Sequence, residues 1–150
     1  MKKIFEDYFS ELQADMVSIC LEYVDNKADM IYIYCSCEAN AVSSDFFFCI
    51  NGATIERHKL NSVYSNTAYD VSAEKQDAVL QIINEDIEKI MKLCKQYERE
   101  MPTEMKIIYN VKRNSLVANY KYDLTYSNEP QKTSDDIAFE WFEQIKKETE

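Results

Sequence analysis

The segment DFFFCING, residues 45–52, does most to decide the fold of this chain. Side chains alternate between the two faces of a strand, so the consecutive Phe46, Phe47 and Phe48 indicate burial on both faces or an interface. The Asn51-Gly52 pair follows directly. It is the strongest short hairpin signal, because both positions of a tight hairpin turn need a positive φ. The segment predicts a strand over 45–50 and a returning strand over about 53–60.

Strand patterns also occur on either side of this hairpin. Residues 30–37 are dense in Ile and Tyr, which favour strands. Farther along, side chains alternate over 105–111 and again over 116–126, with a turn at 112–115 between them and Pro102 ahead of them. Alternation of that length predicts an antiparallel hairpin with one buried face.

Two long segments have the apolar spacing of amphipathic helices. The first covers residues 4–24 and is ended by the polar cluster at 25–27. The second is predicted to begin after Ser72, whose side chain caps the helix, and to run to about Tyr97. Glu74 in its first turn favours the positive end of the helix dipole.

A third helix is predicted to begin at Ser134, as its cap, with Asp135 and Asp136 in the first turn. Its apolar residues are Ile137, Phe139, Trp141, Phe142 and Ile145. The predicted order is therefore helix, three strands, helix, two strands, helix (α-βββ-α-ββ-α). We expect an α+β fold, in which an antiparallel sheet of about five strands has helices packed on one face, in a single domain over 1–150.

The composition excludes several classes of function. The chain has 17 Lys and Arg against 27 Asp and Glu, a net charge of −10, and a single glycine. One glycine cannot build a glycine-rich phosphate loop, and the charge disfavours nucleic acid and anionic membranes. No apolar run approaches the roughly 18 residues that span a bilayer, and Glu6 and Asp7 interrupt any signal peptide.

The cysteines and the histidine offer little chemistry. Five cysteines without a signal peptide indicate reduced thiols in a cytoplasm. A Cys35–Cys37 pair with a single histidine is a weak zinc pattern, so buried cysteines acting as small apolar residues are the better interpretation. His58, the one base available to a cysteine nucleophile, falls in a charged stretch that is typical of a solvated strand. We expect no metal and no cofactor.

Acidic pairs such as Glu85 with Asp86, or Asp135 with Asp136, raise the question of catalysis by two carboxylates. Such an enzyme needs two acids across a cleft, one of them buried, and nothing in the sequence marks these acids as buried. Capping and the helix dipole explain Asp135 and Asp136 more simply. We therefore expect no enzymatic activity.

Several segments of the second half resemble one family. The run MPTEMKIIYNV (101–111), the hairpin end YKYD (120–123) and the closing EWF (140–142) resemble the YezG-like family of bacterial immunity proteins. The likeness is best over about 97–147, and the order of helices and strands agrees over most of the chain. The resemblance implies a small cytoplasmic protein that binds the toxic C-terminal domain of a secreted antibacterial effector, often a nuclease.

Net negative charge by itself can serve only solubility. It also suits the implied role, because an acidic protein can occupy the basic surface with which a nuclease grips phosphates. We expect a monomer or weak homodimer that neutralises a cognate toxin domain. The alternative is an acidic secretion chaperone that binds an effector protein. The predicted contact residues are the acids Asp70, Glu74, Asp77, Glu85, Glu88, Asp123, Asp135 and Asp136.

Overall fold

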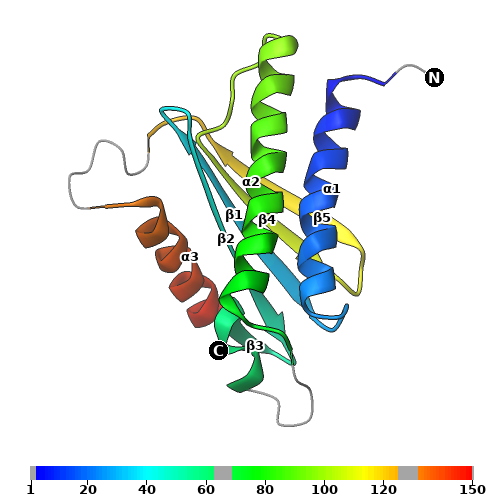
Figure 1. Ribbon diagram of the computed structural model, residues 1–150, viewed down its shortest axis with the longest axis vertical. Coiled ribbons are helices and arrows are strands. Elements are labelled where there is room, and N and C mark those ends of the chain that lie inside the picture. The colour runs from blue at the N-terminus through cyan, green and yellow to red at the C-terminus, as the bar shows by residue number, and fades with distance from the viewer. Residues whose placement is uncertain (1–2, 63–68, 125–131, 150) are drawn as a thin grey trace.

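The computed structural model describes residues 3–62, 69–124 and 132–149. The helices are α1 (Phe5–Tyr23), α2 (Ala73–Gln96) and α3 (Ser134–Thr149), with a short 3-10 helix, η1 (Arg57–Ser62). The strands are β1 (Met30–Glu38), β2 (Ala41–Ile50), β3 (Ala53–Glu56), β4 (Glu104–Asn110) and β5 (Ser115–Lys121). They form one antiparallel sheet of five strands in the order β3-β2-β1-β4-β5 (Figure 1). The predicted α+β class and the order of elements are confirmed.

Helices cover both faces of the sheet. α1 and α2 lie side by side over one face, and α3 lies over the other (Figure 1). Ile31 and Ile33 of β1 join the core beneath α1 and α2, whereas Tyr32 and Tyr34 join the core beneath α3. The prediction that the helices pack on one face is therefore wrong. The central strands carry apolar side chains on both sides, and each side needs its own cover.

The three consecutive phenylalanines are divided between these two cores. Phe46 and Phe48 lie beneath α1, where their ring centroids are 5.2 and 6.0 Å from that of Tyr23. Phe47 points the other way and its ring centroid is 5.1 Å from that of Phe142 in α3. All three are at most 4% exposed. The predicted burial on both faces is confirmed.

Two tight turns hold the β1-β2-β3 meander. Asn51 and Gly52 have φ of 51° and 82°, as the hairpin prediction requires. A second turn at Ala39 and Asn40, with φ of 51° and 64°, joins β1 to β2. Because Ala39 gives no turn signal, the pattern of residues did not reveal this second hairpin.

β3 ends at Glu56, short of the boundary predicted near Leu60. The chain turns there into η1, which leaves His58 and Lys59 exposed and Arg57 half-buried, and buries Leu60 completely. A strand would have pointed one of the three polar residues into the core, because its side chains alternate between faces.

The helix starts agree with expectation only in part. Ser72 caps α2, and its Oγ accepts the Lys75 N–H at 3.2 Å. At α3 the cap is Thr133 and not Ser134: the Thr133 N–H donates to Asp136 at 2.9 Å, and the Asp136 N–H donates to Thr133 Oγ1 at 3.4 Å. This reciprocal pairing is a capping box. The strand predicted to reach residue 126 ends at Lys121, and residues 125 and 126 lie outside the described part of the chain.

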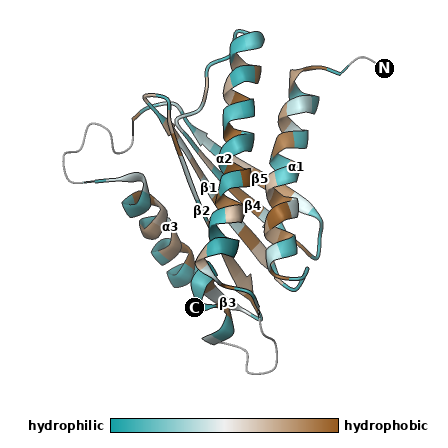
Figure 2. Ribbon diagram, in the orientation of Figure 1, coloured by the Kyte–Doolittle hydropathy of each residue, from teal (hydrophilic) through white to brown (hydrophobic). Residues whose placement is uncertain are grey.

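Hydropathy follows this layered arrangement. In Figure 2 the side of α2 toward the viewer, away from the sheet, is mainly hydrophilic, while β1 and β2 are largely hydrophobic. Among the described helices, none is both long and apolar enough to cross a membrane.

Candidate functional site

A cleft of about 170 Å³ opens where α3 faces β2, β3 and η1. We call it the α3–η1 cleft. It is lined by Asp45, Phe46, Phe47, Glu56, Arg57, His58, Ala138, Phe139 and Phe142. The cleft combines charged side chains from the sheet edge with aromatic rings from α3, so it has the mixed chemistry of a recognition site.

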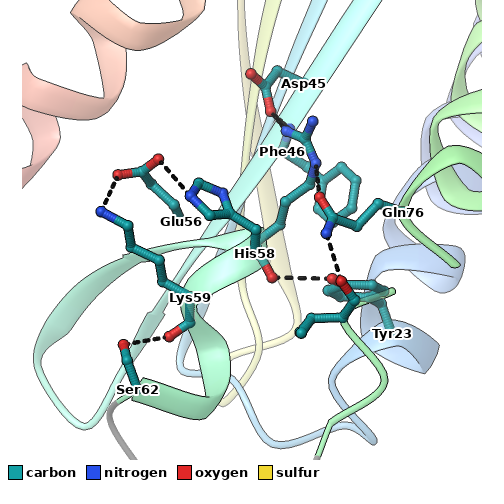
Figure 3. A network of polar contacts seen from close by, with 10 residues as sticks. Tyr23, Asp45, Phe46, Glu56, His58, Lys59, Ser62 and Gln76 are labelled. Carbon is teal, nitrogen blue, oxygen red and sulfur yellow. Dashed lines mark hydrogen bonds and ion pairs between the residues drawn. The ribbon is translucent and has the colours of Figure 1, made fainter. Parts of the chain in front are cut away.

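Arg57 is the structural centre of this region, and Figure 3 labels its partners Tyr23, Asp45, Phe46 and Gln76. Its guanidinium contacts the Asp45 carboxylate, donates from Nε to Gln76 Oε1 at 3.0 Å, and lies 5.2 Å from the centroid of the Phe46 ring. Its backbone carbonyl accepts the Tyr23 O–H at 3.0 Å. Arg57 therefore connects β2, α1 and α2, and its positive charge already pairs with Asp45 of the same chain.

Asp45 lies between a cation and the surrounding acids. Burial raises the pKa of Asp45 above its ordinary value, while the Arg57 guanidinium and the Phe46 N–H, which Asp45 accepts at 2.7 Å, act in the opposite direction. The nearby carboxylates of Asp135 and Glu56 raise the pKa further. Among the residues that line the cleft, Asp45 and Glu56 are acidic, and Arg57 is a cation that pairs with Asp45.

The side of the cleft toward η1 is open to solvent. The Glu56 carboxylate lies 3.5 Å from His58 Nε2 and 3.5 Å from Lys59 Nζ (Figure 3). The side chains of both partners are at least half exposed. Ion pairs this exposed contribute little to stability. A partner can therefore displace Lys59 or His58 from Glu56 at small cost.

Phe139 is the exposed aromatic side chain of the cleft. It is 52% exposed, whereas Phe142 one turn later is 6% exposed. Asp135 and Glu143 lie one helical turn before and after Phe139, hence on the same side of α3. An exposed ring flanked by carboxylates is suited to an Arg or Lys side chain, since the ring face attracts the cation and the acids bind its N–H groups.

Phe139 is among the apolar residues predicted for this helix, and that prediction does not separate it from the buried ones. The buried residues Ala138, Trp141, Phe142 and Ile145 follow the spacing i, i+3, i+4 and i+7. Phe139 falls outside this spacing, which is the signal in the sequence that identifies it as exposed.

The eight acids predicted to contact a partner are all exposed, but they form two groups. Those of the first group lie on exposed positions of α2 or just before it, and those of the second lie just after β5 and at the start of α3. The first group is Asp70, Glu74, Asp77, Glu85 and Glu88, and the second is Asp123, Asp135 and Asp136. Of these eight acids, Asp135 is the one that raises the pKa of Asp45, which lines the cleft.

The cysteines behave as buried apolar residues, as predicted. All five are free and buried. Burial raises the pKa of each thiol, most strongly for Cys20 and Cys35, so none is a ready nucleophile. Within the described ranges, no three His, Cys, Asp or Glu side chains are placed to hold a metal ion.

Asp86, an acid that nothing in the sequence marks as buried, is buried in the structure. Asp86 is 2% exposed on the side of α2 that packs against α1. Burial raises its pKa to about 7, and the adjacent carboxyl of Asp15 in α1 raises it too. None of the principal clefts is lined by either residue. The pair is therefore part of the interface between α1 and α2.

Comparison of the chain with protein-family models and with curated proteins found no match. The argument for function therefore depends on the geometry of the α3–η1 cleft and on the distribution of charge.

Proposed function

We propose that this chain is an immunity protein, which binds the toxic C-terminal domain of a secreted antibacterial effector and neutralises it. The toxin domain is a basic nuclease, and the immunity protein covers the surface that grips phosphates. The observation that carries the proposal is the position of Phe139: an exposed ring on α3 with the acids Asp135 and Glu143 one helical turn to either side, in a protein of net charge −10. The resemblance to YezG-like immunity proteins points the same way.

The contacts suggest how a basic partner would bind. An arginine of the toxin stacks on the Phe139 ring, and its N–H groups reach Asp135, Glu143 or Glu56 at the cleft rim. Arg57 does not repel it, because Asp45 pairs with that guanidinium. Buried aromatic anchors of this kind typically carry much of the energy of an interface. No bond is made or broken, since the protein acts by exclusion.

Electrostatic steering would raise the rate at which the protein associates with its toxin. The acids of α2 and of the α3 start attract a basic domain before contact, and such steering can raise association rates to about 10⁸ M⁻¹s⁻¹ at low salt. Fast capture matters for a toxin that must be bound before it acts.

The test is co-expression with the toxin domain encoded beside the gene of this chain. We expect the wild-type protein to restore growth, to form a 1:1 complex and to inhibit cleavage of nucleic acid. Phe139→Ala should weaken binding by about 2 kcal/mol or more, the usual cost of removing an aromatic anchor. The matched control is Leu124→Ala, which also truncates an exposed apolar side chain, 48% exposed, but outside the cleft.

Absence of protection and of complex formation would contradict the proposal. If Phe139→Ala and Leu124→Ala weaken binding equally, the protein still binds the toxin, but the α3–η1 cleft is not the binding site. Hydrolytic turnover by the purified chain, or tight binding to DNA at physiological salt, would contradict action by masking.

A secretion chaperone is the second candidate, and one observation favours it. A cleft of about 300 Å³ includes the apolar side chains of Phe5, Phe9, Tyr120 and Tyr122. Such a cleft suits an extended apolar segment of an effector. Binding of an unfolded effector segment, with no affinity for the folded toxin domain, would favour the chaperone.

A further inference from the structure

β5 is the long free edge of the sheet. Within the described residues it has a neighbour only on its β4 side, and six of its seven side chains are exposed. On the opposite side of the sheet β3 has four residues and passes directly into η1, and residues 41–46 of β2, which β3 does not reach, are mostly half-buried. A long exposed edge presents unpaired N–H and C=O groups to another strand, and proteins usually blunt or cover such an edge.

The charge around β5 differs from that of the rest of the molecule. Lys106 and Lys121 lie on the hairpin strands, and Lys112 and Arg113 lie in the turn between them, while the acid Glu104 is buried 3.9 and 3.8 Å from the two strand lysines. The acidic excess of the chain therefore lies elsewhere. A second copy can approach this edge without bringing the acidic faces of α2 together.

We propose that β5 pairs with β5 of a second copy, antiparallel about a two-fold axis at Ala118, to continue the sheet across a homodimer. In this register Leu116 of one copy faces Tyr120 of the other, and these side chains are 38% and 39% exposed in the single chain. Lys121 faces Ser115 of the second copy, so no like charges oppose one another along the strands. Such isologous pairing repeats every contact twice.

The same register places opposite charges together at both ends. Asp123 follows β5, and Thr103 Oγ1 donates to the backbone carbonyls of Lys121 and Asp123 at 3.1 and 2.6 Å, which holds this end beside the sheet. Counting along the antiparallel strands brings Asp123 of one copy beside Arg113 of the other. Within one copy these two residues are at opposite ends of β5, roughly 30 Å apart at the usual rise per residue, so they cannot pair internally.

A charge-swap experiment tests the dimer and its register together. The dissociation constant would be measured by sedimentation equilibrium for the purified chain, without any toxin. We expect a weak, concentration-dependent dimer. Arg113→Glu and Asp123→Arg should each weaken it about tenfold, through two repulsive pairs per dimer, and the double variant should restore it. Glu88→Lys, on the outer side of α2, is the matched control and should leave the dissociation constant within about twofold.

Rescue by the double variant would support the proposal, because no contact within one copy can produce it. A chain that stays monomeric at the highest soluble concentration would overturn the proposal, as would a dimer indifferent to both single changes. If amide exchange in β5 slows only in the toxin complex, β5 is part of the toxin interface and the homodimer proposal is overturned. The inference does not depend on the proposed function, since the experiment uses this chain alone.

Discussion

Removing the charge of Asp86 should stabilise the protein, and more so at high pH. Asp86 is buried between α1 and α2, no N–H or O–H group reaches its Oδ2 among the described residues, and its nearest acidic neighbour is Asp15. Lys89 lowers the pKa of Asp86, but by less than burial and Asp15 raise it. The substitution Asp86→Asn keeps the size of the side chain and replaces the carboxylate by a neutral amide.

The sign and size follow from the pKa. Burial raises the pKa of Asp86 from 3.8 to about 7 in the folded state. Below about pH 4 Asp86 is protonated in both the folded and the unfolded state, and it costs no stability. As the pH rises toward about 7, Asp86 ionises only in the unfolded state, so the free energy of unfolding falls. Above about pH 7 Asp86 is ionised in both states, and the full loss of stability is present. A rise of the pKa from 3.8 to about 7 corresponds to about 4 kcal/mol of stability lost at high pH, and screening by solvent near the exposed Asp15 reduces this loss to roughly 2–4 kcal/mol.

Urea unfolding followed by the fluorescence of Trp141, the single tryptophan, gives the free energy of unfolding. We expect Asp86→Asn to exceed the wild type by roughly 2–4 kcal/mol at about pH 8 and by little at about pH 4. Glu88→Gln, an exposed acid on the same helix, should change stability by less than about 0.5 kcal/mol at either pH. An advantage of Asp86→Asn that is equal at both pH values would refute the reasoning.

Three further predictions concern the site and the fold. Arg57→Ala leaves Asp45 without its cation and should lower the free energy of unfolding by about 2–4 kcal/mol in urea titrations; a change below about 0.5 kcal/mol would contradict the role of Arg57 as a connector. Gly52→Ala should lower stability by about 1 kcal/mol, measured in the same way, because φ is +82° although no atom crowds an added Cβ. Phe142→Ala should cost about 3–5 kcal/mol and Phe139→Ala less than about 1 kcal/mol, and equal losses would mean that Phe139 is a core residue.

Local patterns were enough for the order of the helices and strands, but not for all of their ends or for the layers they form. The turn at Asn51 and Gly52, the alternation of β4 and the cap at Ser72 are short-range signals, and each was predicted correctly. Which face a helix covers depends on contacts between distant segments. The alternation of Ile and Tyr in β1, with apolar residues in every position from Met30 to Cys35, contained the information that two faces needed cover.

For the candidate site, the sequence predicted exposed acidic residues but not how the side chains are arranged. The sequence identified acids that are exposed, and all eight are. It did not identify Phe139 as exposed, although the spacing of the buried residues of α3 excludes it. It could not show that Arg57 pairs with Asp45, or that Asp86 faces Asp15, because these pairs join elements that only the folded chain brings together.

The most direct test of masking by charge is the rate at which the chain captures its toxin domain as a function of salt. Stopped-flow association would be compared for the wild type and for a variant with Asp135→Lys and Glu143→Lys, the two acids flanking Phe139. The account predicts that the wild-type rate falls steeply with ionic strength, and that the variant associates at least about tenfold more slowly at low salt with a shallower dependence. A wild-type rate that does not change with salt, or a variant that matches it, would contradict the account.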